Sequence, residues 1–113
     1  MGVAACLLVT KVLNCAAAPV VQTPSPELSL QLQAVLADAS RRSGMETRSL
    51  KIAVVEHVIW LDGSLGCPEP DVMYTQSLVP GYRVRIEAAG EALDYHAAAG
   101  GALLLCPPGR ALP

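Results

Sequence analysis

The amino-acid sequence predicts an α+β fold, in which one N-terminal amphipathic helix packs on a small antiparallel sheet of three or four strands. Residues 28–39 repeat apolar side chains at helical spacing, whereas residues 82–88 alternate apolar and polar side chains as a half-buried strand does. The turn sequence at residues 89–91 contains Gly90 and indicates a hairpin. One helix followed by a run of strands disfavours a parallel sheet, whose strands are joined by crossover helices.

The predicted helix has sequence signals at both ends. Ser25 is suited to cap its N-terminus, Pro26 suits the first turn, and Gly44 follows Arg41 and Arg42 as the stop. The face that we expect to cover the sheet is formed by five apolar residues: Leu28, Leu32, Val35, Leu36 and Ala39.

Four segments have strand patterns. Residues 51–61 carry apolar side chains at both odd and even positions, so both faces of the strand are largely apolar. This pattern predicts a central strand that is covered on one face and half-covered on the other. Residues 82–88, 92–97 and 102–106 follow as shorter strands. A hairpin centred near Gly90 would place Asp94 and His96 on the outer face, beside Arg83 and Arg85. We therefore predict that His96 is a surface neighbour of arginine.

Length and composition exclude several classes of function. The 113 residues suffice for one domain, and the net charge is −2, from 8 basic and 10 acidic residues. Because no basic stripe is available, the composition argues against binding to nucleic acid or to an anionic membrane surface. The hydrophobic fraction of 52% includes no Phe, so the core must be built from Leu, Val, Ile and a few larger side chains. So small a core often needs a covalent link.

The first 18 residues are expected to form a secretory signal. An apolar run up to Val9 is followed by Lys11 and then by the small residues 16–18, and the run is too short to span a bilayer. The alternative is an N-terminal helix packed on the domain. Lipid attachment at Cys15 is a further alternative, which Asn14 disfavours. We divide the chain into signal (1–18), linker (19–26), domain (27–106) and tail (107–113), and expect the protein to be periplasmic or secreted.

Removal of the signal leaves Cys67 and Cys106, which we expect to form a disulfide. It would close a loop of about 40 residues and contribute roughly 4 kcal/mol on the chain-entropy model. A metal site formed by these cysteines with His57 and His96 lacks C-x-x-C or H-x-x-x-H spacing. A catalytic Cys67 would need a histidine partner and a reducing compartment. We expect no metal, no cofactor and a half-exposed His57.

The connection at residues 62–76 is the candidate functional segment. It is longer than hairpin loops normally are, and Cys67, Pro68 and Pro70 restrict it, so we expect a compact, ordered loop with an exposed binding rim. Tyr74 is expected to pack inward, with its hydroxyl donating to a backbone acceptor. The candidate binding residues are Asp62, Ser64, Leu65, Glu69, Met73, Tyr74 and Gln76.

These motifs resemble a family of small exported bacterial proteins of unknown function. The features shared with that family are a Trp-x-Asp-Gly-Ser-Leu-Gly-Cys-Pro segment at residues 60–68, Met73 with Tyr74-Thr75-Gln76, Pro80-Gly81-Tyr82, Tyr95-His96 and the distal Cys106. The resemblance covers roughly residues 27–106 and implies no activity. The layout is also similar to that of small protease-inhibitor and PepSY-type domains, from which function does not follow.

Three hypotheses for the function arise from the sequence. The first is an exported module that presents residues 62–76 to a cell-envelope or extracellular protein, with a protease-inhibitor-like domain as its variant. The second is a structural envelope protein whose loop serves only to fold the domain. The third is a small hydrolase, which we disfavour because Ser64 lacks a G-x-S-x-G elbow and no histidine is placed beside it. We therefore predict a protein that is not an enzyme.

Overall fold

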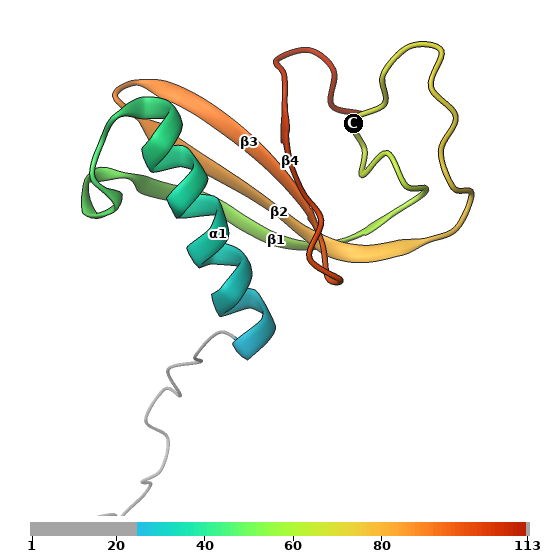
Figure 1. Cartoon of the computed structure of the whole chain (residues 1–113), viewed down its shortest axis with the longest axis horizontal. Coiled ribbons are helices and arrows are strands. Elements are labelled where there is room, and N and C mark those ends of the chain that lie inside the picture. The colour runs from blue at the N-terminus through green and yellow to red at the C-terminus, as the bar shows by residue number, and fades with distance from the viewer. Residues whose placement is uncertain (1–24, 113) are drawn as a thin grey trace, which may run out of the picture.

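A computed structural model describes residues 25–112. This part of the chain forms a helix α1 (Pro26–Ser43), a 3₁₀ turn η2 (Thr47–Ser49) and four strands, β1 (Lys51–Trp60), β2 (Val79–Ala88), β3 (Glu91–Ala98) and β4 (Leu103–Cys106). The strands form one antiparallel sheet in chain order, and α1 crosses one of its faces (Figure 1). The predicted α+β fold is confirmed. The expected signal, its alternatives and the linker up to residue 24 lie outside the described residues.

Helix α1 begins and ends at the predicted residues. The Ser25 hydroxyl accepts a hydrogen bond from the Leu28 amide at 3.1 Å, which satisfies one free N–H of the first turn. Gly44 ends the helix with φ at +76°, and its amide donates to the Ser40 carbonyl. The helix starts at Pro26, so the last residue assigned to the linker belongs to the domain.

The predicted apolar face of α1 packs on the sheet. Val35 and Ala39 are fully buried against Val84, Ile86 and Tyr95 of the strands. Three leucines complete the contact while remaining partly exposed: Leu28, Leu32 and Leu36.

Two buried or half-buried polar contacts fix the position of α1 on the sheet. The Gln31 side-chain amide donates to the Ala98 carbonyl at 2.6 Å, and the Tyr95 hydroxyl donates to Asp38 Oδ2 at 2.7 Å. Burial raises the pKa of Asp38, but hydrogen bonds from Tyr95 and Arg42 outweigh that effect and hold the pKa below its ordinary value.

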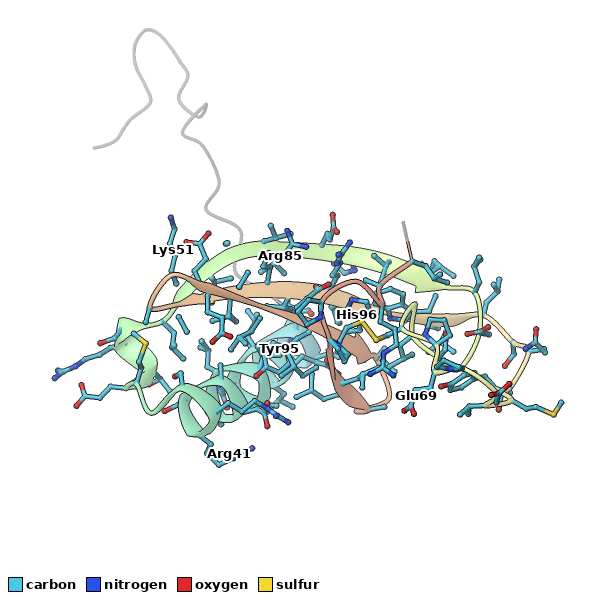
Figure 2. All side chains as sticks on the ribbon, turned by 90° about the horizontal axis from the view of Figure 1, so that it is seen from above. Arg41, Lys51, Glu69, Arg85, Tyr95 and His96 are labelled. Carbon is cyan, nitrogen blue, oxygen red and sulfur yellow. A yellow bond between two sulfur atoms is a disulfide. The ribbon has the colours of Figure 1, made fainter. Side chains whose placement is uncertain are left out.

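The register of the sheet defines two faces, an inner face under α1 and an outer face on the opposite side. Val84 pairs with Tyr95 on the inner face, whereas Arg83 pairs with His96 and Arg85 with Asp94 on the outer face. Figure 2 shows Tyr95 on the side of the helix and Arg85 on the other side. The predicted hairpin and its assignment of side chains to faces are therefore confirmed.

The prediction of a central position for residues 51–61 is wrong, because among the described strands β1 lies at the edge of the sheet and pairs with β2 alone. Its apolar side chains at Ile52, Val54, Val55 and Ile59 are exposed. The helix packs mainly on β2 and β3, and it leaves most of β1 uncovered. Apolar residues at both odd and even positions of this strand reflect the strand propensity of these residue types and do not reflect burial on both faces.

Candidate functional site

The segment of residues 61–78, here called the β1–β2 loop, lies at one end of the sheet. Figure 1 shows this loop beside the C-terminus of the chain, beyond the ends of the strands. Residues of the loop contact the outer face at His96, while α1 occupies the inner face. The candidate segment is thus packed onto the domain through a face that the helix does not use.

The ring of His96 joins the loop to the sheet. It stacks on Trp60, with ring centroids 4.7 Å apart and planes inclined by 14°. Its Nδ1 faces the Leu65 carbonyl oxygen at 2.5 Å, and since a carbonyl oxygen can only accept, Nδ1 carries a proton and donates. The Trp60 indole N–H donates to the Ala97 carbonyl at 3.0 Å. The end of β1, the central strand β3 and the loop therefore meet at the His96 ring.

The prediction that His96 lies on the surface is wrong. It is the cross-strand neighbour of Arg83, as expected, but its exposed fraction is 1% because Trp60 and the loop cover the outer face at this position. His57 is exposed on β1 and lies against Tyr82, with ring centroids 4.7 Å apart. The two histidines lie on opposite faces of the sheet, since His57 pairs with Tyr82 of the inner face.

A half-buried ion pair between Arg83 and Asp94 lies beside the His96 ring. Arg83 donates from Nε and Nη2 to the two carboxylate oxygens of Asp94, at 3.0 and 2.9 Å, and His96 Nε2 lies 3.2 Å from Asp94 Oδ2. Burial raises the pKa of Asp94, but the hydrogen bonds from Arg83 and His96 outweigh burial and lower that pKa below its ordinary value. Asp94 is therefore a carboxylate at neutral pH.

Hydrogen bonds within the β1–β2 loop give it a fixed shape. Asp62 Oδ1 accepts from the Ser64 amide at 2.9 Å and from the Ser64 hydroxyl at 2.6 Å, and these bonds lower the pKa of Asp62. The Gly63 amide donates to the Thr75 carbonyl at 2.9 Å, which closes the base of the loop. The connection is ordered by its own contacts, as its length requires.

Tyr74 braces the outer part of the loop. Its hydroxyl oxygen accepts a hydrogen bond from the Glu69 amide at 2.9 Å, and its ring is half-buried. We expected this hydroxyl to donate a hydrogen bond to a backbone acceptor, whereas its oxygen accepts one from a backbone amide. Pro68 and Pro70 flank Glu69 and carry no amide proton, so Glu69 provides the backbone donor at this turn.

The predicted disulfide is present between Cys67 and Cys106, whose Cα atoms are 5.9 Å apart. It joins the middle of the loop to the end of β4. The adjoining Gly66 carbonyl accepts a hydrogen bond from the Leu112 amide at 2.9 Å, so the C-terminal segment that we assigned to a tail packs on the loop. The loop is therefore connected to β3 by the hydrogen bond with His96 and to β4 by the disulfide. A backbone hydrogen bond connects it to the C-terminal segment.

All seven sequence-predicted binding residues lie in the β1–β2 loop, but they differ in exposure. Ser64 and Leu65 are buried, with Leu65 only 6% exposed, so both support the loop from within. Asp62 and Tyr74 are half-buried, whereas Glu69, Met73 and Gln76 are exposed. The sequence analysis missed three exposed apolar residues on the same loop: Leu61, Val72 and Leu78. Leu61 follows Trp60, which is buried against His96 on the outer face, and strand alternation could have placed the Leu61 side chain on the opposite side.

A groove of about 370 Å³ adjoins the loop on the outer face. Its lining includes Val58, Trp60 and Arg83 of the sheet, Asp62 of the loop and Leu112 of the C-terminal segment. Within residues 25–112, no cluster of three or more His, Cys, Asp or Glu side chains could hold a metal ion. The helix in this part of the chain is not apolar enough over a sufficient length to cross a membrane.

The first prediction concerns the contact between the loop and Trp60. Gly66 has φ at +69°, and a Cβ atom there would lie 2.7 Å from Cζ3 of Trp60. We expect Gly66→Ala to lower the free energy of unfolding by about 2–4 kcal/mol, through backbone strain and overpacking together.

Gly44→Ala is the matched control, because Gly44 has φ at +76° and a Cβ atom there meets nothing within 4 Å. It should lower the free energy of unfolding by about 1–2 kcal/mol, from backbone strain alone. Urea denaturation measures both. Equal losses of unfolding free energy in the two variants would show that the backbone at Gly66 is not in close contact with the Trp60 ring.

The second prediction concerns the pH dependence of stability. Because the folded-state pKa of Asp94 is lowered, its contribution is present above the unfolded-state pKa of about 3.9 and is lost as the pH falls through the folded-state value. Asp94→Asn should therefore be less stable than wild type at neutral pH, and the difference should shrink as the pH falls from about 5 to about 2. Glu91→Gln, at an exposed position of the same strand, is the control. A stability difference between Asp94→Asn and wild type that stays constant over this pH range would show that the ionised Asp94 carboxylate does not stabilise the fold.

No curated protein and no solved structure matches this chain. A family model described as a domain of unknown function (DUF8738) matches residues 32–106. The match runs from within α1 to the last residue of β4, and it includes the β1–β2 loop and both cysteines of the disulfide. Since the model covers more than half of the chain, the protein belongs to this family of domains of unknown function.

Proposed function

We propose that the protein is an exported protein-binding module whose contact surface is the exposed rim of the β1–β2 loop. The observation that carries the proposal is the combination of a braced loop with exposed apolar side chains at its surface. Met73 is 96% exposed, and Leu61, Val72 and Leu78 are also exposed on the same loop. Apolar side chains gathered on one exposed segment are typical of a site that a partner covers.

The bracing of the loop favours binding over a purely structural role. The Gly63–Thr75 hydrogen bond closes the base of the loop and the Tyr74–Glu69 hydrogen bond holds its outer part, so both lie within the loop and add little to the core of the domain. A loop that is already ordered loses less conformational entropy when a partner binds. A loop that served only the fold would not need to expose Met73.

Charge indicates what kind of partner the rim fits. Residues 61–78 contain three carboxylates, Asp62, Glu69 and Asp71, and no lysine or arginine. A partner surface with an apolar centre and basic groups around it would match Met73 and the acidic residues beside it. Association with such a partner should weaken as the salt concentration rises.

The disulfide supports an exported location for this function. Cys67 and Cys106 are bonded, and structural disulfides persist in oxidising compartments such as the periplasm or the extracellular space. We propose that residues 1–18 direct this export, as the sequence analysis predicts, and that the partner is a cell-envelope or extracellular protein.

Binding without catalysis fits the polar groups of the site. The Ser64 hydroxyl donates to Asp62 and is buried, and His96 is enclosed between the Leu65 carbonyl and the Asp94 carboxylate. A nucleophile needs an adjacent base and access to substrate. Neither residue is available for such a role in the described part of the chain.

Inhibition of a protease is the second candidate, and the exposure of Met73 favours it. A side chain that is 96% exposed on a disulfide-anchored loop could enter the apolar primary pocket of a serine protease. This candidate is a special case of protein binding, and the identity of the partner distinguishes the two.

The third prediction tests the proposed surface by affinity capture from cell-envelope extract. We expect a protein that is retained by wild type and lost by Met73→Ser/Leu78→Ser, because these changes remove exposed apolar area without disturbing the core. Capture of a protease that the wild-type protein inhibits would select the second candidate.

Leu30→Ser is the matched control, since Leu30 is 67% exposed on α1, away from the loop. It should retain the same protein as wild type, and circular dichroism should show that all variants are folded. Identical capture by wild type and the loop variant, or no specific capture at all, would contradict the proposal and favour a structural role.

A further inference from the structure

Both ring nitrogens of His96 face hydrogen-bond acceptors. Nδ1 lies 2.5 Å from the Leu65 carbonyl oxygen, and Nε2 lies 3.2 Å from Oδ2 of Asp94. A neutral imidazole has one N–H and one unprotonated nitrogen, whereas the imidazolium form has an N–H at each nitrogen. Both contacts can be hydrogen bonds at the same time only if the ring carries two protons.

Neither acceptor can take the role of a donor. The Leu65 carbonyl oxygen can only accept, and no backbone amide of residues 25–112 donates to it. Asp94 accepts from Nε and Nη2 of Arg83 through its two oxygens, which keeps it in the carboxylate form. A neutral ring would therefore set a nitrogen lone pair against an oxygen lone pair in either tautomer.

Contacts of the ring compensate for the burial of its charge. Burial disfavours a charged side chain, and His96 is only 1% exposed. The Asp94 carboxylate offsets that cost because it lies in direct contact with Nε2. The Trp60 indole stacks on the other side of the contact, with ring centroids 4.7 Å apart, and an indole face attracts a cation.

Charged groups on the elements around His96 also favour a positive ring. Arg83 of β2 is a cation, and its charge is paired with the carboxylate beside the ring. Glu56 of β1 is the cross-strand neighbour of Arg83, and Asp62 belongs to the loop that covers the ring. β4 places the uncharged Leu104 opposite His96, and α1 lies on the other face of the sheet. With a neutral ring, one cation would stand against three carboxylates in this region.

We propose that His96 is an imidazolium cation in the folded protein and that its second proton controls how tightly the β1–β2 loop is held on the sheet. Release of the proton from Nε2 to solvent would leave a nitrogen lone pair against the Asp94 carboxylate. The same ring is the hydrogen-bond donor to the Leu65 carbonyl, so any displacement of the ring loosens the loop. This inference concerns the shape of the loop and does not depend on the proposed binding rim.

The direction of the pH dependence follows from linkage between proton binding and folding. A histidine in an unfolded chain has a pKa of about 6.5. If the fold binds the second proton of the ring, the resulting stability is fully present below about pH 6.5 and is lost as the pH rises and the folded ring releases that proton. The loop should therefore be held tightly at acidic and neutral pH and more loosely at alkaline pH.

Long-range proton–nitrogen correlation spectra of the isotope-labelled full chain test the charge, because the chemical shift of a ring nitrogen shows whether it carries a proton. At about pH 7.5, one unit above the ordinary histidine value, both nitrogens of His96 should have the shift of a protonated nitrogen. The chain contains 2 histidines, so His57→Gln assigns the signals. One unprotonated nitrogen on His96 in the folded wild type would overturn the proposal.

Asp94→Asn tests the cause of the charge. A carboxamide can turn its NH₂ group toward Nε2 and donate, so a neutral ring that is protonated on Nδ1 alone then satisfies both contacts. In this variant Nε2 of His96 should have the shift of an unprotonated nitrogen at the same pH. Glu91→Gln, at an exposed position of the same strand, should keep both nitrogens protonated. Two protonated nitrogens in Asp94→Asn would contradict the proposal.

His96→Gln tests the effect on the loop, because glutamine keeps an N–H donor but has no titrating proton. As the pH rises from about 6 to about 9, the urea midpoint of wild type should fall relative to that of His96→Gln. His57→Gln, which changes the exposed histidine, should retain the fall.

The backbone amides of the wild type report on the loop without any variant. The amide signals of Leu65 and Cys67 should shift together with the ring nitrogens of His96 as the pH rises, whereas the amide of Ala39 in α1 should not. Loop amides that do not follow the ring, or a constant difference between the urea midpoints of wild type and His96→Gln, would overturn the control of the loop by the proton. If a variant does not fold, the wild-type spectra still decide both parts of the proposal.

Discussion

The shape of the β1–β2 loop depends on the enclosed ring of His96. This ring stacks on Trp60 at the end of β1, donates from Nδ1 to the Leu65 carbonyl of the loop, and lies beside the ion pair between Arg83 of β2 and Asp94 of β3. Removal of the ring would leave a buried carbonyl without a donor and one face of Trp60 without a neighbour. The disulfide then fixes the far side of the same loop to β4.

These contacts explain how so small a domain supports a long connection. The helix covers the inner face and supplies the main core, whereas the second apolar cluster, at Trp60, Leu65 and Ala98, belongs to the loop and the outer face. Gly66 and Gly81 allow this second cluster to close, because a Cβ atom at either position would collide with the Trp60 ring, and at Gly81 also with the Ala97 carbonyl. The rim that remains outside these contacts carries Met73 and the carboxylates that we propose as the binding surface.

Elements with local signals could be predicted from the sequence. The caps of α1 at Ser25 and Gly44 and the alternation of residues 82–88 follow from short-range chemistry, and the structure agrees with both. The Cys67–Cys106 pair was expected on the hypothesis that the other two cysteines belong to a signal segment, and the disulfide is present. The position of β1 at the edge and the burial of His96 depend on how distant segments meet, which one sequence does not specify. Apolar residues at both parities suit an exposed edge as well as a central strand. The strand pattern placed His96 on the correct face, but it did not show that Leu65 and Trp60 would cover that face.

Amide hydrogen exchange before and after reduction of the disulfide tests the central claim that the loop is held in one conformation by His96, Trp60 and Cys67–Cys106. The amides of Gly63, Cys67 and Glu69 donate to acceptors within the loop. In the oxidised protein they should exchange slowly, and reduction should speed their exchange far more than that of the β2 and β3 amides. Exchange of these three amides at the rate of an unstructured peptide in the oxidised protein would contradict the claim.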